Sequence, residues 1–66
     1  MDKKRFDEMM EHIVTALSAR GYDPYMQLLG YVTENEPTYI TSHNGARSLI
    51  QTLDFEQVKQ YVRQMK

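Results

Sequence analysis

Apolar residues recur along this chain at helical spacing, in blocks separated by short segments rich in Gly, Pro and polar residues. In the first block they occupy the i, i+3, i+4 and i+7 positions of one helical face, which predicts a helix over about residues 3–20. The inward residues of this helix are Phe6, Met9, Met10, Ile13, Val14 and Leu17. Asp2 is placed to cap the helix, and Gly21 to end it in the left-handed conformation that glycine adopts freely.

A second helix is predicted from Asp23-Pro24, which joins an N-cap residue to a proline suited to the first helical position. It should end near Asn35, because Pro37 restricts the residue before it. Its expected apolar face is Leu28, Leu29 and Val32, with Tyr25 or Met26 at the start. Gly30 lies inside this helix at a cost of about 1 kcal/mol relative to alanine. We therefore expect another helix or an aromatic ring to approach Gly30 closely.

Residues 36–42 are predicted to form an extended connector, with Tyr39 or Ile40 packed inward. A short third helix should follow, from residue 43 or 44 to residue 52, capped by Ser42 or Asn44. Its buried residues should be Ala46, Leu49 and Ile50, with Leu53 as a further candidate. Asp54 is a strong N-cap for a fourth helix. The inward stripe of that helix is Phe55, Val58, Tyr61, Val62 and Met65.

Four short amphipathic helices in 66 residues predict one all-α domain, residues 1–66, built as a small bundle. A chain this short needs disulfides, a metal, very regular packing or a partner subunit to be comfortably stable. It has no cysteine and only two histidines, so we expect regular helix packing together with homodimerisation, and no metal. The apolar stripes of the first and fourth helices are the expected dimer interface.

The net charge of -1 argues against broad electrostatic binding of nucleic acid or of anionic membranes. The chain has no apolar run that suits a signal peptide or a membrane span, so we expect a cytoplasmic protein. A helix-turn-helix-like nucleic-acid-binding module is the alternative from another class, with residues 43–52 as its recognition helix. That segment carries a single arginine. A protein that binds in the major groove of DNA needs several cations that contact phosphates.

No pairing of a nucleophile with a base, no metal-ligand spacing and no phosphate-binding loop is recognisable, so we expect no enzymatic activity and no cofactor. The five tyrosines are most simply explained by packing. A sharper interpretation is an exposed patch that binds a partner protein. Its candidate residues are Tyr31, Tyr39, His43 and Arg47. Arginine offers a planar fork for a carboxylate or phosphate, although Arg47 could instead pair within the chain with Glu34 or Glu36.

One spaced pattern is more specific than composition or periodicity. It consists of Gly21-Tyr22, Pro24, Gln27, Gly30-Tyr31, Pro37, Tyr39-Ile40, His43, Ala46-Arg47 and Leu49-Ile50. This pattern resembles the signature of the IreB family of regulatory phosphoproteins, which are small cytoplasmic proteins of Gram-positive bacteria. The resemblance implies an all-helical homodimer without enzymatic activity. It also implies a substrate of a membrane-anchored PASTA-type Ser/Thr kinase and its partner phosphatase, which tunes cell-envelope (peptidoglycan) synthesis through regulated proteolysis.

Two departures from the family pattern shape the expected sites. Family members carry threonine acceptors in an N-terminal tail, whereas here no Ser or Thr precedes Thr15, which lies in mid-helix. We therefore expect a divergent member with a short tail, in which the switch is lost or has moved. The candidate acceptors are Thr33, Thr38, Thr41 and Ser42. The family is also rich in arginine around the third helix, where this chain keeps only Arg47 and has Ser42 and Gln51, which predicts an altered partner contact.

Overall fold

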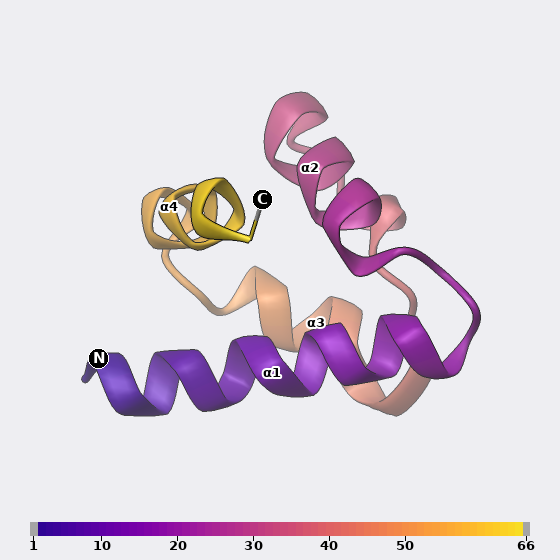
Figure 1. The fold of residues 1–66 in the computed structure, drawn as a ribbon, viewed down its shortest axis with the longest axis horizontal. Coiled ribbons are helices and arrows are strands. Elements are labelled where there is room, and N and C mark those ends of the chain that lie inside the picture. The colour runs from indigo at the N-terminus through magenta and orange to yellow at the C-terminus, as the bar shows by residue number, and fades with distance from the viewer. Residues whose placement is uncertain (1, 66) are drawn as a thin grey trace.

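The structure is a computed structural model that describes residues 2–65, and all regular elements within that range are helical. The four α-helices are α1 (Lys3–Ala19), α2 (Pro24–Glu34), α3 (Ala46–Gln51) and α4 (Phe55–Gln64). Two short 3-10 turns, η1 (Pro37–Tyr39) and η2 (His43–Gly45), separate α2 from α3 (Figure 1). The predicted all-α fold of four short helices is confirmed.

Aspartate side chains begin three of the four α-helices, as the sequence predicts. Asp2 accepts a hydrogen bond from the backbone N–H of Lys4 at 3.0 Å. Asp23 accepts from two backbone N–H groups at the start of α2, and Asp54 accepts from that of Glu56 at 2.9 Å. Each bond satisfies a donor that has no partner inside its helix, and such a cap contributes about 1 kcal/mol. These caps fix where the apolar stripes begin.

The start of the third helix differs from the prediction, because two consecutive residues have left-handed backbone. Asn44 has φ 53° and Gly45 has φ 73°. This pair, at the end of η2, turns the chain, so α3 begins only at Ala46 and the predicted helix is split. Neither Ser42 nor Asn44 supplies a side-chain cap, so both predicted caps are wrong. Instead, the Oγ1 of Thr41 accepts from the backbone N–H of His43 at 3.1 Å, at the start of η2.

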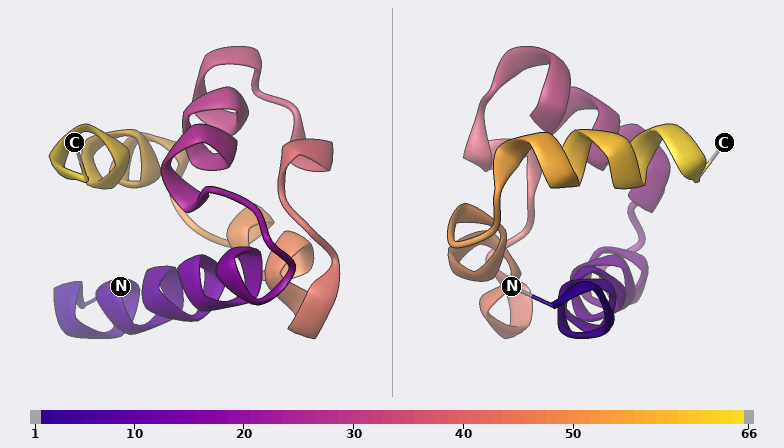
Figure 2. Two further views of the ribbon diagram at one scale, coloured as in Figure 1. Left: turned by 45° about the vertical axis from the view of Figure 1, so that its right-hand side comes forward. Right: turned by 90° about the vertical axis from the view of Figure 1, so that its left-hand side faces the viewer.

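The helices form two layers that cross each other. α1 and α3 lie side by side in one layer, and α2 and α4 lie side by side in the other. Figure 1 shows α4 nearly end-on while α1 runs across the view, and the turned views in Figure 2 show the same crossing. The radius of gyration is 10.5 Å, close to the ~10.8 Å expected for a folded domain of this length.

The core fills the space between the two layers. Its buried residues are Phe6, Met10, Ile13, Ala16, Leu17, Leu28, Tyr31, Ile40, Ala46, Ile50, Leu53, Val58 and Val62. Most of these were predicted from the helical stripes. Leu29 is an exception, because it is 36% exposed on the outer side of α2, while Tyr31 occupies the core in its place.

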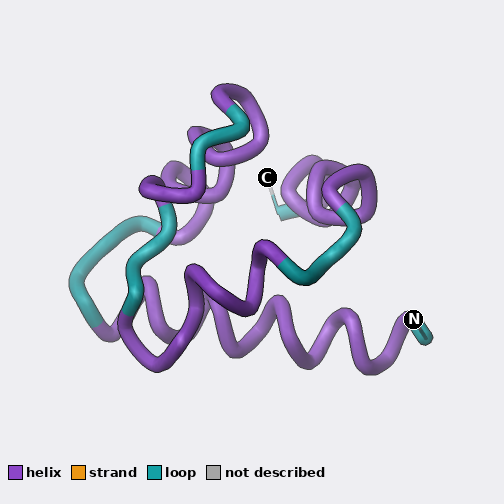
Figure 3. Tube along the Cα trace, turned by 180° about the vertical axis from the view of Figure 1, so that it is seen from behind, coloured by secondary structure: helices purple, strands orange, loops and turns teal. Residues whose placement is uncertain are grey.

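The connector, residues 36–45, is more compact than the predicted extended segment. It consists of the two 3-10 turns joined by three residues, and it passes along the edge of the bundle between α2 and α3 (Figure 3). Ile40 is fully buried and Tyr39 is 38% exposed. The connector therefore contributes one side chain to the core and presents its other residues near the surface.

Candidate functional site

Side chains from α2 and α3 hold the middle of the connector by its backbone. The side-chain amide of Gln27 donates to the carbonyl of Tyr39 at 2.9 Å. The Nε of Arg47 donates to the next carbonyl along the chain, that of Ile40, at 2.8 Å. Because a 3-10 turn leaves such carbonyls without regular partners, these two bonds replace the missing backbone ladder. The middle of the connector is thus fixed from both sides.

A third side chain, from α1, reaches the end of the connector. The Nε2 of His12 lies 2.9 Å from the carbonyl oxygen of Asn44, where the Nε2–H form of the ring donates. His12 is exposed. Its bond nevertheless ties α1 to the left-handed turn that precedes α3. The connector is therefore anchored by α1, α2 and α3 together.

The ring of Tyr39 packs directly on Gly30, which explains the glycine inside α2. A Cβ built on Gly30 would lie 2.6 Å from both Cδ1 and Cε1 of Tyr39. That separation is far shorter than the 3.5–4.0 Å of ordinary carbon contacts. Of the two expected causes for this glycine, a helix or an aromatic ring, the structure selects the ring.

The proposed recognition patch does not form as a set of four exposed residues. Tyr31 is buried at 5% exposure and meets the ring of Phe55 edge-on, with centroids 5.6 Å apart. Its burial raises the pKa of its hydroxyl above the ordinary value of 10.0. The expectation that Tyr31 faces a partner is wrong for this fold, because it faces the core between α2 and α4. Tyr39 is the one member of the four that is exposed.

His43 begins η2 and Arg47 lies in the first turn of α3, and both side chains are half-buried. Within residues 2–65 Arg47 makes no ion pair, so the alternative pairing with Glu34 or Glu36 is absent there. Its Nε is used by the connector, and its terminal amino groups meet no acceptor among the described residues. The side chain of His43 likewise makes no hydrogen bond in that range. Arg47 is thus both a structural residue and a source of free donors.

The four candidate phosphate acceptors differ in their surroundings. Thr33 is exposed but lies inside α2. Thr41 is half-buried and its hydroxyl is occupied by the backbone of His43. Thr38 and Ser42 are exposed and lie outside the α-helices, in the connector. A kinase needs an accessible acceptor on a segment that can open locally, and connectors meet this need better than helices.

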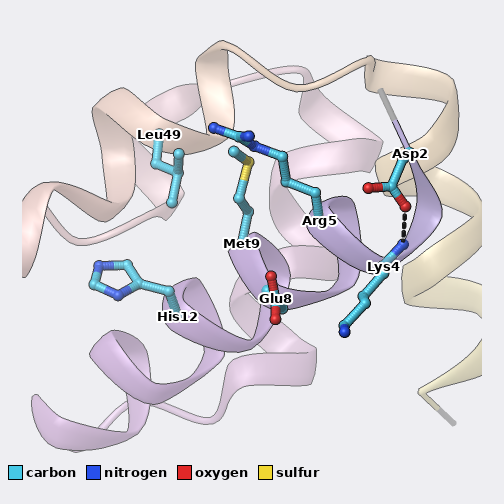
Figure 4. Close-up of a pocket in the computed structure, with 7 residues that line it drawn as sticks. All are labelled: Asp2, Lys4, Arg5, Glu8, Met9, His12 and Leu49. Carbon is cyan, nitrogen blue, oxygen red and sulfur yellow. Dashed lines mark hydrogen bonds between the residues drawn. The ribbon is translucent and has the colours of Figure 1, made fainter.

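A surface hollow lies beside the first turns of α1, and Leu49 of α3 also lines it. Asp2, Lys4, Arg5, Glu8, Met9 and His12 complete its lining, and Figure 4 shows charges of both signs around it. The hollow is shallow and most of its lining side chains are exposed. Mixed charges on an open surface provide no defined binding chemistry, so we assign it no role.

Three other features bear on the expected functions. No three His, Cys, Asp or Glu side chains within residues 2–65 gather in a way that could hold a metal ion. None of the helices in that range has the length and apolar character needed to cross a membrane. α3, the recognition helix of the nucleic-acid alternative, carries only Arg47 as a cation, and the connector uses its Nε. The nucleic-acid alternative gains no support from this geometry.

The fold and its anchored connector define a small all-helical protein in which the distinctive polar contacts serve to position a loop. The chain matches the family model described as IreB regulatory phosphoprotein over residues 1–64 of its 66. It therefore belongs to the IreB family, as its spaced pattern predicted. A regulatory phosphoprotein is not a class of catalyst, and family membership supports a regulatory role.

Four residues of the spaced pattern that identified the family take part in positioning the connector. Gln27 and Arg47 supply the anchoring bonds, Gly30 makes room for a ring, and Tyr39 provides that ring. These residues were recognised in the sequence, but their common contacts with the connector were not predicted. The available signal was a glycine in mid-helix, about nine residues before an aromatic residue in a loop.

Proposed function

We propose that this protein is a cytoplasmic, non-enzymatic regulator that works by protein–protein contact and is switched by phosphorylation. In this proposal a PASTA-type Ser/Thr kinase adds the phosphate and a partner phosphatase removes it. The protein tunes cell-envelope synthesis by acting on the regulated proteolysis of a peptidoglycan enzyme, and it works as a homodimer. The observation that carries the regulatory part is the family match over residues 1–64.

The connector is the proposed place of the switch. Its two exposed hydroxyls, Thr38 and Ser42, lie outside the α-helices. A phosphate adds a charge of about -1.5 to -2. At Thr38 this charge would stand beside Glu36, whose carboxylate accepts the Thr38 backbone N–H at 3.3 Å. Repulsion there would loosen η1 and, with it, the hold on Tyr39.

Arg47 is the proposed partner contact. Its half-buried side chain is held in place by the bond to Ile40, and its terminal amino groups are free of acceptors within residues 2–65. A pre-oriented guanidinium can bind a carboxylate or phosphate with two parallel bonds. His43 lies in the same connector and completes the proposed contact.

A pull-down from lysate of a Gram-positive bacterium with a PASTA-type kinase tests the proposal. Tagged wild-type protein is compared with Arg47→Lys, which keeps the charge but loses the planar fork, and with Arg20→Lys on an exposed site as the matched control. We expect wild type and the Arg20 variant to recover the kinase, the phosphatase or proteolysis components, and Arg47→Lys to recover less. Recovery of none of these proteins by wild type would contradict the proposed circuit. Equal recovery by all three chains would remove Arg47 from the contact.

A further inference from the structure

The large apolar side chains that remain exposed are gathered on one part of the molecule. They are Tyr22, Met26, Leu29 and Tyr39, with exposures of 48%, 56%, 36% and 38%. All four lie on α2, just before it, or on the connector that packs against it. The stripes of α1 and α4, which were expected to form the dimer interface, are instead largely used by the core.

The sequence of α2 explains this surface. Its eleven residues carry one charge, at Glu34, and apolar residues surround the helix on nearly all sides. A helix that is apolar all round is normally buried all round. Here Leu28 and Tyr31 face the core, while Met26 and Leu29 face outward. The outward side of α2 is thus an apolar face without a cover in one copy.

Two shallow hollows lie on this face, and Leu29 lines both of them. The hollow toward α4 is lined by Tyr25, Leu29, Val32, Thr33, Lys59, Val62 and Arg63, and has a volume of about 370 Å³. The hollow toward the connector is lined by Met26, Gln27, Leu29, Gly30, Thr33, Glu34 and Tyr39, and has a volume of about 360 Å³. Met26, which lines the second hollow, is the most exposed large apolar side chain of this face. The α2 face, defined by these two linings, therefore has both a protruding flexible side chain and recesses that would accept one.

We propose that the α2 face is the contact between two copies of this chain. This inference rests on the homodimer in the proposed function and names its surface. Two properties of the face favour a second copy as its occupant. It offers Met26 as a knob and the hollows beside Leu29 as holes. A two-fold interface requires such self-complementarity, because the same patch must serve on both sides.

The charges at the edges of the α2 face are also self-complementary. Glu34 lines one hollow and Arg63 lines the other, so they lie on opposite sides of Leu29. Both are exposed, and neither forms an ion pair within residues 2–65. A two-fold axis that passes close to Leu29 can bring Glu34 of each copy to Arg63 of the other. The two resulting pairs would border an apolar centre, as in most protein interfaces.

Sedimentation equilibrium over a range of protein concentrations tests the face. Met26→Glu places a charge at its most exposed apolar position, and Thr15→Glu places the same charge on the exposed side of α1 as the control. We expect a wild-type dimer, a dissociation constant raised about tenfold or more by Met26→Glu, and no change with Thr15→Glu. Circular dichroism confirms that each variant keeps its helices.

The possible failures are distinguishable. A wild-type chain that stays monomeric at millimolar concentration would overturn the homodimer of the proposed function together with its surface. A wild-type dimer that Met26→Glu leaves intact would overturn the α2 face alone.

A charge exchange tests the pairing across the axis. Glu34→Arg and Arg63→Glu should each weaken the dimer, since each places like charges together. The double variant should restore the affinity, because the exchange rebuilds both pairs in reverse. Failure of the double variant to recover any of the loss would overturn the pairing of Glu34 with Arg63.

Discussion

Replacing Gly30 by alanine tests the packing that positions the connector. The new methyl group would lie 2.6 Å from two ring atoms of Tyr39, so the ring must move by about 1 Å to reach a normal carbon contact. The ring cannot simply swing away, because the backbone carbonyl of Tyr39 is held by Gln27 and the next residue, Ile40, is fully buried. We therefore expect the change to be felt through the whole connector.

Two opposing terms set the size of the effect. Alanine in place of glycine inside a helix stabilises by about 1 kcal/mol. Overpacking of a tight contact costs about 1–3 kcal/mol. Their sum predicts that Gly30→Ala lowers the free energy of unfolding by about 0–2 kcal/mol. When Tyr39 is first replaced by alanine the clash disappears, and the same Gly30→Ala change should then stabilise by about 1 kcal/mol.

Urea denaturation of wild type, the two single variants and the double variant measures this cycle. The account predicts a coupling of about 1–3 kcal/mol between the two positions. Hydrogen exchange at the connector amides should also accelerate in Gly30→Ala, but not in the control Ser18→Ala, which lies on an exposed part of α1. If Gly30→Ala stabilises the wild-type background as much as the Tyr39→Ala background, the ring does not pack on Gly30 and the reasoning is refuted.

Asp23→Ala should destabilise by about 1 kcal/mol in urea denaturation, because Asp23 accepts from two N–H groups of α2; an unchanged midpoint would contradict that cap. Arg47→Gln should cost about 1–3 kcal/mol, since the Ile40 carbonyl loses its donor; Arg20→Gln is the exposed control, and equal stability of the two variants would argue against the anchor. Burial raises the pKa of Tyr31 above its ordinary value of 10.0, so the folded state holds this proton more tightly than the unfolded state. The free energy of unfolding that Tyr31 contributes should therefore be fully present below pH 10 and fall as the pH rises beyond it. Tyr31→Phe should make that fall less steep, whereas the exposed Tyr22→Phe should not. Identical pH profiles of the two variants would contradict the prediction.

Helix positions were predictable because their signals are local. Asp2, Asp23 and Asp54 stand where N–H groups need acceptors, and Gly21 takes a left-handed conformation with φ 84°. Such signals depend on a few neighbouring residues, and at these positions tertiary packing did not override them. The same holds for the stripe of α1, whose buried residues recur at the helical period.

The connector and the outer side of α2 were harder to predict because they depend on contacts between distant segments. The left-handed pair at Asn44 and Gly45 is stabilised by His12, which lies 32 residues earlier than Asn44. Tyr31 rather than Leu29 is buried in the core because α4 places the ring of Phe55 against Tyr31. Periodicity within α2 could not decide between them, since the helix has apolar residues on all sides.

The central claim is that this family member is switched by phosphorylation of its connector. The most direct measurement is incubation of the purified protein with ATP and the catalytic domain of a PASTA-type kinase, followed by mass spectrometry of the intact chain and its peptides. Thr38→Ala and Ser42→Ala locate the acceptor, with Thr15→Ala as the control within α1. The account predicts a phosphate on Thr38 or Ser42 that the matching variant removes. A chain that takes no phosphate, or takes it only at residues inside the α-helices, would contradict the account.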